Sequence, residues 1–452
     1  MAKKQYRNTN NKTVNVGLIS LGCPKNTVDS EAMLGRIAHR GYTIVGDINL
    51  ADVVIVNTCG FIEPAKQEAV DQLKDVAQYK DNGRLKLIIA AGCLAQRMGE
   101  KLKELVPQID IIVGLADRDR IDEIISQNIE EISHSLYLRE NGSFITDDRG
   151  RLLTTPGHYA YLRISEGCNR RCAFCTIPDI RGPFRSKPIK DIAREAEELA
   201  KYGVKELVII AQETNNYGKD IGIAGGLVEL LSVLENFDFE WIRVMYMYPA
   251  AVTDELIAKI AGSKKILPYI DIPIQHINND ILKSMRRVDT KEKTTSLIEK
   301  LRAAMPNIVL RTTLITGYPG ETESQHQELV EFIKWAKFDA LGCFTYFAEE
   351  GTHAATLDGQ VPQAIKDKRL DEIMTTQQDI VFAKNEAMIG REFNVIIDRI
   401  CEDGSAEGRY YGQAPEIDSL CIIEKHKSKP GRMIKARVDD YSDYDLVVKA
   451  LA

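Results

Sequence analysis

Three cysteines lie within eight residues of one another in this 452-residue chain. Cys168, Cys172 and Cys175 form a C-x-x-x-C-x-x-C pattern in the segment EGCNRRCAFCTIPDIRG, directly after an apolar run. Three thiolates can hold three irons of a cubane cluster and leave the fourth iron without a protein ligand. A zinc site is the alternative, but zinc sites usually pair C-x-x-C ligands with a fourth Cys or His nearby, which this segment lacks. The spacing therefore predicts an iron–sulfur cluster with one open iron.

Three further cysteines are far apart in sequence but follow apolar runs in the same way. Cys23, Cys59 and Cys93 end the segments LISLGC, VIVNTC and IIAAGC. Ligands of a parallel sheet gather at the carboxyl ends of its strands, so these three thiols can converge there. Each cysteine alone is explained more simply as a small buried residue in a tight turn. Three cysteines in the same position instead indicate a second cluster, again with three thiolate ligands.

The composition indicates in which kind of protein and compartment these cysteines occur. The total of nine is odd, which does not suit a secreted disulfide framework, and we expect the remaining three, in strands or the tail, to be structural. The amino terminus, MAKKQYRNTNNK, is polar, and no stretch reaches the length of a membrane span, so we expect a cytoplasmic protein without a membrane partner. The net charge of -7 disfavours nucleic-acid binding through bulk positive charge.

The elements that must position the cysteines fall into three predicted domains. In residues 14–135, apolar runs alternate with helical stretches, which predicts a doubly wound parallel sheet. The polar stretch over residues 130–157 is interpreted as a hairpin or linker. Residues 154–385 contain six strand–helix units, which predict an open, partial (β/α)6 barrel with its site at the carboxyl ends of the strands. Residues 386–452 change to short strands and turns, which predict a small antiparallel β-barrel. The fold class is thus α/β.

With both cysteine sets on domains in this order, the chain resembles the radical S-adenosylmethionine methylthiotransferases, whose C-terminal barrel is called a TRAM domain. The resemblance implies two 4Fe-4S clusters, S-adenosyl-L-methionine and an electron donor. The cluster on Cys168, Cys172 and Cys175 would cleave S-adenosylmethionine to a 5′-deoxyadenosyl radical, which takes a hydrogen atom from an unactivated carbon. The second cluster would carry the inserted sulfur. Such chemistry belongs to the cofactors, and the protein positions them.

Several stretches resemble the branch of this family that methylthiolates the β-carbon of an aspartate in ribosomal protein S-twelve. They are RISEGCNRRCAFCTIPDIRGPFRS, VIIAQETNNYGKDI, GRYYGQAPEIDSL and ARVDDYSDYDLVVKA. The alternative branch modifies tRNA adenosine and tends to have a GQNVNSYG-like stretch where this chain has AQET. Residues 377–452 carry 14 Asp and Glu against 11 Lys and Arg, which suits a basic ribosomal protein, free or on the small subunit, better than direct RNA binding. A local run of basic residues over 425–437 would instead favour RNA binding.

The resemblance also implies cofactor-binding residues at the ends of barrel strands. Glu213 would contact the methionine part of S-adenosylmethionine, and Gly317, Pro319 and Gly320 would let the backbone approach the cofactor. Ordinary strand-end turns explain these residues equally well. The sequence assigns no role to four further polar residues near the predicted site: Arg181, Arg185, Asp271 and His276.

An electron-transfer protein that carries two clusters but transfers no group is the alternative from another class. Clusters that only pass electrons normally have four cysteine ligands, and each set here has three.

Overall fold

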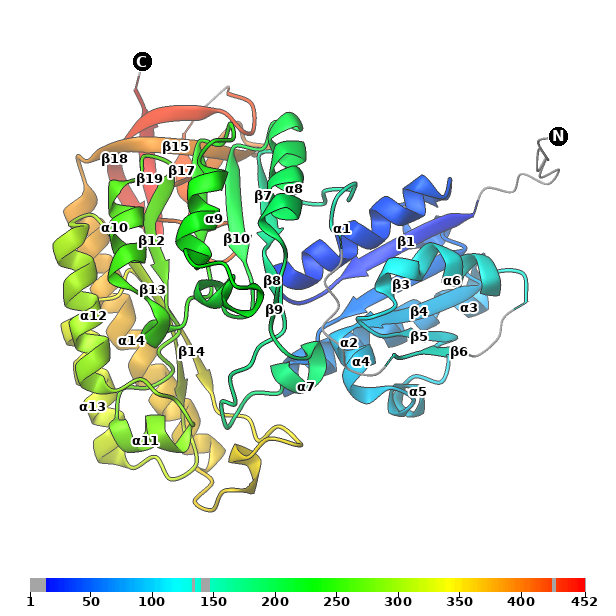
Figure 1. Ribbon diagram of the computed structural model, residues 1–452, viewed down its shortest axis with the longest axis horizontal. Coiled ribbons are helices and arrows are strands. Elements are labelled where there is room, and N and C mark those ends of the chain that lie inside the picture. Colours follow the sequence, from blue (N-terminus) through cyan, green and yellow to red (C-terminus); the bar gives the residue numbers. More distant parts are fainter. Residues whose placement is uncertain (1–13, 132–134, 140–146, 425–427, 452) are drawn as a thin grey trace. The chain divides into compact units, whose positions relative to one another are not determined.

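The contacts within the computed structural model divide the chain into two compact units (Figure 1). The structure describes residues 14–131, 135–139, 147–424 and 428–451. The first unit comprises Met1–Leu152 together with Asp179–Arg181, and the second comprises Leu153–Pro178 and Gly182–Ala452. Of the helices in the described ranges, none combines the length and the apolar character that a membrane span requires.

The first unit is built on a six-stranded parallel sheet with the strand order β2-β1-β3-β4-β5-β6. Its strands are β1 (Asn15–Ser20), β2 (Thr43–Ile44), β3 (Val53–Thr58), β4 (Leu87–Gly92), β5 (Ile111–Val113) and β6 (Ser135–Tyr137). This confirms the predicted parallel sheet. Strand β6, however, lies in the stretch that was interpreted as a hairpin or linker, and that interpretation is wrong for residues 135–137 because they pair in parallel with β5.

Helices cover both faces of this sheet. The helices are α1 (Pro24–His39), α2 (Glu63–Ala77), α3 (Tyr79–Asn82), α4 (Cys93–Met98), α5 (Lys101–Leu105) and α6 (Ile121–Asn128). Alternate residues of β3 point to opposite faces: Val53 and Ile55 pack with α1 and α6, and Val54 and Val56 pack with α2. Because both faces are covered, the central strands are apolar throughout, which is the pattern that the sequence shows.

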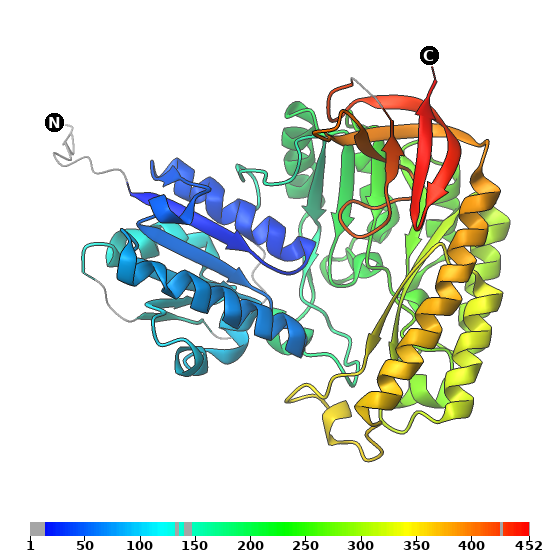
Figure 2. The same cartoon turned by 180° about the vertical axis from the view of Figure 1, so that it is seen from behind.

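The second unit contains a six-stranded parallel sheet with the order β14-β13-β12-β11-β10-β7. Its strands are β7 (Tyr159–Arg163), β10 (Glu206–Ile210), β11 (Trp241–Val244), β12 (Ile266–Asp271), β13 (Val309–Thr316) and β14 (Ala340–Thr345), and β8 (Ser165–Glu166) and β9 (Arg185–Ser186) form a separate antiparallel pair. The helices of this unit are α8 (Ile189–Lys201), α9 (Gly226–Leu234), α10 (Asp254–Gly262), α11 (Asn279–Ser284), α12 (Lys291–Ala304), α13 (Glu323–Ala336) and α14 (Gln363–Met388). Helix α7 (Ile177–Arg181) begins in this unit, but its residues Asp179–Arg181 belong to the first unit. Helix α14 packs along β14 (Figure 2).

The two faces of this second sheet differ in chemistry. Leu207 and Ile209 of β10 belong to the apolar core with the helices, whereas the neighbouring Glu206 faces the opposite way, toward Arg243 of β11. The helical face therefore holds the hydrophobic core, and the opposite face carries the charged side chains of these two strands. This arrangement of six strand–helix units confirms the predicted partial (β/α)6 barrel.

The C-terminal part of the second unit is a closed five-stranded barrel. Its strands are β15 (Glu392–Ile400), β16 (Ala406–Tyr410), β17 (Cys421–Ile423), β18 (Met433–Ser442) and β19 (Asp445–Ala450). The pairs are antiparallel as predicted, except that β17 and β19 run in parallel. Cys421 is fully buried in the core of this barrel, which fits a structural cysteine.

Buried ion pairs attach the small barrel to the start of the parallel sheet. Glu206 accepts hydrogen bonds from Arg243 at 2.7 Å and from Arg409 at 2.5 Å, and all three side chains are buried. Arg409 also binds Asp398 at 2.8 Å, and Asp398 contacts His158 at 2.7 Å. The charged groups satisfy one another, as buried charges must.

The loop between β16 and β17 completes the polar face of the sheet. Glu416 accepts hydrogen bonds from the hydroxyl groups of Tyr159 and Tyr161 at 2.8 and 2.9 Å. Asp418 accepts from the Tyr269 hydroxyl at 2.6 Å and from Arg311 at 3.2 Å. The tail segment GRYYGQAPEIDSL thus has a structural role, because its residues contact five strands of the sheet: β7, β10, β11, β12 and β13.

Candidate functional site

The cysteine loop of the second unit begins directly after β8 and is held at several points. Gly167 has φ +74°, and a Cβ atom there would lie 2.5 Å from the carbonyl oxygen of Gly182, so the turn requires glycine. The amide of Cys168 donates to the same Gly182 carbonyl at 3.1 Å. The amide of Ala173 donates to Met285 at 2.9 Å. These backbone contacts fix the position of the loop.

Backbone amides point at two of the three sulfurs in this loop. The amide of Arg170 donates to Sγ of Cys168 at 3.4 Å, and the amide of Ile177 donates to Sγ of Cys175 at 3.5 Å. Burial raises the pKa of Cys168 to about 11, and the Arg170 amide opposes that rise. Burial also raises the pKa of Cys172. The two amides are placed to stabilise thiolates at Cys168 and Cys175 when a metal binds there.

Glu213 contacts the cysteine loop. It follows β10, is buried, and its Oε1 atom accepts two hydrogen bonds from Arg170 at 2.9 and 2.6 Å. The Arg170 guanidinium also lies 4.0 Å from the centre of the Tyr248 ring, with Arg287 on the same ring at 4.5 Å. The sequence reasoning missed Arg170 and Tyr248, because their contacts join segments that are far apart along the chain.

The predicted glycine turn follows β13, as expected from its sequence. Gly317 and Gly320 have φ +72° and φ +80°. A Cβ atom at Gly317 would collide with the side chain of Lys366 in α14, so the close approach at this glycine comes from the protein itself. A Cβ atom at Gly320 would meet no other atom within 4 Å. The carboxylate of Glu321 turns back to accept the amides of Gly317 and Tyr318, which fixes the turn that contains Pro319.

Two residues to which the sequence assigned no role are buried and contact polar groups of the protein. Asp271, at the end of β12, is fully buried and accepts from Arg311 at 3.3 Å and from the amide of Tyr246 at 3.0 Å. Tyr246 has φ +61°, an unusual value for a tyrosine, and this hydrogen bond helps to hold it there. His276 is also fully buried, with its Nε2 atom 3.8 Å from Glu321.

Orphaned polar atoms near the cysteine loop test whether a polar cofactor fits there. The hydroxyl groups of Ser165 and Thr176 and the Oε1 atom of Gln212 are buried and lack a hydrogen-bond partner within the described part of the chain. Gln212 donates through its nitrogen to Glu166 at 2.7 Å, so its free oxygen is an acceptor. Buried polar groups without partners are uncommon. A cofactor with ammonium, carboxylate and hydroxyl groups, such as S-adenosylmethionine, fits this donor set.

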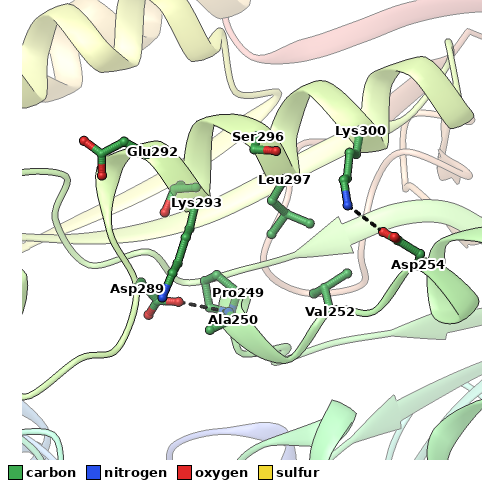
Figure 3. Close-up of a pocket in the computed structure, with 11 residues that line it drawn as sticks. Pro249, Ala250, Val252, Asp254, Asp289, Glu292, Lys293, Ser296, Leu297 and Lys300 are labelled. Carbon is green, nitrogen blue, oxygen red and sulfur yellow. Dashed lines mark hydrogen bonds and ion pairs between the residues drawn. The ribbon is translucent and has the colours of Figure 1, made fainter.

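A pocket elsewhere on the second unit is not part of this site. Residues of α10, α12 and the segment around Pro249 line it, and none of the predicted site residues is among them (Figure 3). Its carboxylates are already engaged: Asp254 pairs with Lys300 at 2.8 Å, and Asp289 accepts the amide of Ala250 at 2.9 Å. The pocket therefore offers little to a new ligand.

The three cysteines of the first unit lie at the carboxyl ends of three neighbouring strands. Cys23 precedes α1, Cys59 follows β3, and Cys93 begins α4 directly after β4. A Cβ atom added to Gly22 would lie 2.8 Å from Cβ and 3.1 Å from Sγ of Cys59, so the turn before Cys23 touches Cys59. The structure therefore brings the loops of Cys23 and Cys59 into contact although they are 36 residues apart.

Asn26 connects the loops that carry these cysteines. Its amide nitrogen donates to the carbonyls of Leu21 and Thr58 at 2.9 and 3.0 Å, and its Oδ1 atom lies 3.5 Å from Sγ of Cys93. Asn57 in turn donates to the carbonyl of Asn26 at 2.9 Å. These buried hydrogen bonds hold the loops of all three cysteines in one arrangement.

The three cysteines of the first unit differ in exposure: Cys93 is buried, whereas Cys23 and Cys59 are partly exposed. Burial raises the pKa of Cys93 to about 12, the Arg181 guanidinium opposes this rise, and the thiols of Cys23 and Cys59 add to it. In the described residues, no three His, Cys, Asp or Glu side chains surround one position for a single metal ion. A cubane presents a separate iron to each thiolate, so a cysteine triad for a cubane need not converge on one point. The donor set of three thiols suits such a cluster.

The backbone conformation of Gly92, directly before Cys93, leads to a testable prediction. Gly92 has φ +92° and ψ -155°, a region that is essentially restricted to glycine, and a Cβ atom there would lie 2.7 Å from the carbonyl oxygen of Thr58 and also collide with Asn57. We expect Gly92→Ala to lower the free energy of unfolding of the first unit by about 1–3 kcal/mol. It should also reduce the iron bound by this unit, because it displaces Cys93.

Chemical denaturation and iron analysis check this expectation, with Gly46→Ala as the control, because Gly46 has open space around its Cα atom and no positive φ. Equal stability and equal iron content of the two variants would contradict it.

Three family profiles match successive parts of the chain. The uncharacterized protein family UPF0004 matches residues 15–114, the radical SAM superfamily matches residues 162–333, and the TRAM domain matches residues 389–451. Two solved structures share the fold at 15% sequence identity. The radical S-adenosylmethionine methyltransferase TsrM from Kitasatospora setae gives a TM-score of 0.53 over 73% of this chain and 72% of its own. The cobalamin-dependent radical enzyme OxsB gives 0.52 over 81% and 56%.

Curated relatives match almost the whole chain. The protein named ribosomal protein uS12 methylthiotransferase RimO from Clostridium botulinum is 44% identical over 96% of this chain and 97% of its own length. Relatives of the same name from Thermoanaerobacter and Trichlorobacter lovleyi are 43% and 41% identical, each over 96% of this chain. Identity at this level over the full length, with both cysteine sets in place, shows that the chain belongs to the RimO family of radical S-adenosylmethionine methylthiotransferases.

Proposed function

We propose that this enzyme methylthiolates the β-carbon of an aspartate in ribosomal protein uS12, using two 4Fe-4S clusters. The observation that supports this proposal best is the match to RimO relatives over 96% of the chain, together with one set of three cysteines in each compact unit. We propose that three domains carry this function: residues 14–135, residues 154–385 and residues 386–452.

In the barrel, Cys168, Cys172 and Cys175 would hold three irons of a cluster, and the fourth iron would bind S-adenosylmethionine. When bound, the cluster and S-adenosylmethionine would supply the one-electron cleavage that starts hydrogen abstraction. Side chains alone cannot perform this chemistry. The protein keeps the loop in place through the Arg170–Glu213 ion pair, at 2.6 Å and largely buried on the Glu213 side.

Around the cofactor, three free polar atoms are the candidates to bind it. Ser165, Thr176 and Gln212 offer two hydroxyl groups and one acceptor oxygen. Glu213 would act mainly through Arg170, which it orients, and the turn with Gly317, Pro319 and Gly320 would form a wall of the site. These contacts orient the cofactor so that the reactive carbon and the target carbon can approach each other.

In the first unit, Cys23, Cys59 and Cys93 would hold the second cluster, whose open iron would carry the sulfur that is inserted. The Asn26 hydrogen bonds support this role, because they fix the three cysteine loops while leaving the sulfurs as ligands. An electron donor must supply reducing equivalents to both clusters.

The substrate assignment rests on the relatives, whose names specify uS12. The acidic tail supports a basic protein partner, since residues 377–452 contain 14 acidic and 11 basic side chains. A ribosomal substrate, free or on the small subunit, supports a location in the cytoplasm.

Mass spectrometry of an anaerobic reaction tests this proposal. We expect the reconstituted enzyme, given S-adenosylmethionine and a strong reductant, to add one methylthio group to a uS12 peptide that carries the target aspartate. A peptide with asparagine at that position should stay unmodified. Modification of tRNA under the same conditions, with no change in the peptide or in intact ribosomes, would contradict the substrate assignment.

A further inference from the structure

Arg181 belongs to the first unit although it closely follows the cysteine loop of the second. Only six residues of sequence lead from Cys175 to Arg181, the last residue of α7. Residues 179–181 nevertheless pack with the first unit. Ile180 lies in a small apolar cluster with Cys93 and Leu115, so the backbone before Arg181 is anchored beside a cysteine of the first unit.

The Arg181 side chain is directed at the first cysteine set. Its Nη2 atom lies 3.3 Å from Sγ of Cys93, 2.6 Å from Oδ1 of Asn26 and 3.0 Å from Oδ2 of Asp29. The side chain is only 2% exposed. An arginine does not lose its proton in proteins, so a permanent positive charge lies in hydrogen-bond contact with the sulfur of Cys93.

Asp29 fixes this guanidinium from the other side. Its Oδ2 atom binds Arg181 and its Oδ1 atom binds Arg118 at 3.1 Å, and all three side chains are buried. Arg118 shares this carboxylate with Arg181, and it is Arg181 whose guanidinium lies 3.3 Å from the sulfur of Cys93. The two arginines therefore form a natural comparison, because they have the same carboxylate partner and similar burial.

We propose that Arg181 is a positioning residue for the cluster of the first unit, which donates a hydrogen bond to the Cys93 sulfur and favours the reduced state of that cluster. Hydrogen bonds to cluster sulfurs and nearby charge are the means by which a protein sets a reduction potential. Reduction adds negative charge, which a fixed guanidinium stabilises. The inference rests on the proposed second cluster.

The test isolates the cluster of the first unit in the full-length chain. Cys168, Cys172 and Cys175 are replaced by alanine together, so that reconstitution loads only the other site with about four irons. In this background we compare Arg181→Gln, Arg181→Lys and Arg118→Gln. The readouts are iron per chain and the midpoint potential, followed by electron paramagnetic resonance during a redox titration.

We expect Arg181→Gln to shift the midpoint potential to more negative values by clearly more than Arg118→Gln does. Arg181→Lys, which keeps the charge, should restore part of the difference. Loss of iron in Arg181→Gln alone, with iron retained in Arg181→Lys and Arg118→Gln, would also support the assignment, because the contact then holds the site together.

Two other results overturn the inference and can be told apart. If the parent triple variant binds no iron, the proposed second cluster fails and the role of Arg181 fails with it. If the parent binds about four irons but the two glutamine variants have the same iron content and the same potential, the second cluster stands and Arg181 is only a structural ion-pair partner.

Discussion

The Cys172→Ala variant is expected to form neither 5′-deoxyadenosine nor methylthiolated product, whereas Cys59→Ala should still form 5′-deoxyadenosine and lose only the methylthiolated product. Each cluster is proposed to have three thiolate ligands, so removal of one leaves too few to anchor it. The two cysteine sets lie in separate compact units, and each has its own network of hydrogen bonds. Loss of one cluster should therefore leave the other site assembled.

Three measurements on the same anaerobic samples check this expectation. Iron analysis should give about eight irons per chain for the parent and about four for each variant, since each variant keeps one 4Fe-4S cluster. Chromatography quantifies 5′-deoxyadenosine, and mass spectrometry detects the modified uS12 peptide. Cys343→Ala is the control, because Cys343 lies in β14 and belongs to neither set, and it should keep both products.

A different pattern would contradict the division of labour. If Cys59→Ala forms no 5′-deoxyadenosine although it retains about four irons, the first cysteine set takes part in cleavage of the cofactor. If Cys172→Ala still yields modified peptide, the loop of Cys168, Cys172 and Cys175 does not hold the cluster that starts the reaction.

The parallel strands could be predicted from the sequence because each is a short apolar run that is buried on both faces or packed under helices. Strand β2 has only two residues and β6 has three, SLY, flanked by polar sequence, so neither carries enough of a pattern to be recognised. Both lie at an edge of the sheet, where burial places the weakest demand on residue type.

The position of the cysteines could be predicted, but the partners that hold them could not. Strand ends of one parallel sheet must lie at one edge, so Cys23, Cys59 and Cys93 could be grouped from sequence alone. Arg181 contacts Cys93 across 88 positions of sequence, and only tertiary packing determines such a contact. Sequence also could not show that Glu213 holds Arg170.

The tail shows a different limit of sequence reasoning. Its segment GRYYGQAPEIDSL was recognised as typical of one branch of the family, and the resemblance by itself gave the segment no physical role. In the structure, Arg409, Glu416 and Asp418 instead bind strands of the parallel sheet. These residues attach the small barrel to the sheet. A motif match alone cannot distinguish residues that hold two parts of the fold together from residues that bind a substrate.

That attachment leads to the largest stability effect that we expect. Glu206→Gln should lower the free energy of unfolding of the second unit by about 3–5 kcal/mol, because it breaks a buried ion pair and leaves charge uncompensated. Glu206 is fully buried and is the shared partner of Arg243 and Arg409. In this variant Arg409 keeps its ion pair with Asp398, whereas Arg243 loses its carboxylate partner.

Tryptophan fluorescence during chemical denaturation measures this effect selectively. Both tryptophans of the chain, Trp241 and Trp335, lie in the second unit, and Trp241 is in the same strand as Arg243. Glu197→Gln is the control, because Glu197 lies on the surface, where its pair with Lys201 is exposed to solvent, and it should leave the transition unchanged. Coincident transitions for Glu206→Gln and the parent would show that the buried charges do not hold the small barrel in place.

The pH dependence of the same transition gives an independent check. Burial raises the pKa of Glu206, but the charges of Arg409 and Arg243 outweigh it and hold the pKa below the ordinary value of 4.5. A carboxyl with a lowered pKa in the folded state stabilises the fold above its unfolded pKa, and this stabilisation is lost as the pH falls through the folded pKa. The parent should therefore lose more stability than Glu206→Gln below about pH 4.5, and the two curves should converge in acid, because the parent carboxyl is then protonated and neutral like the amide.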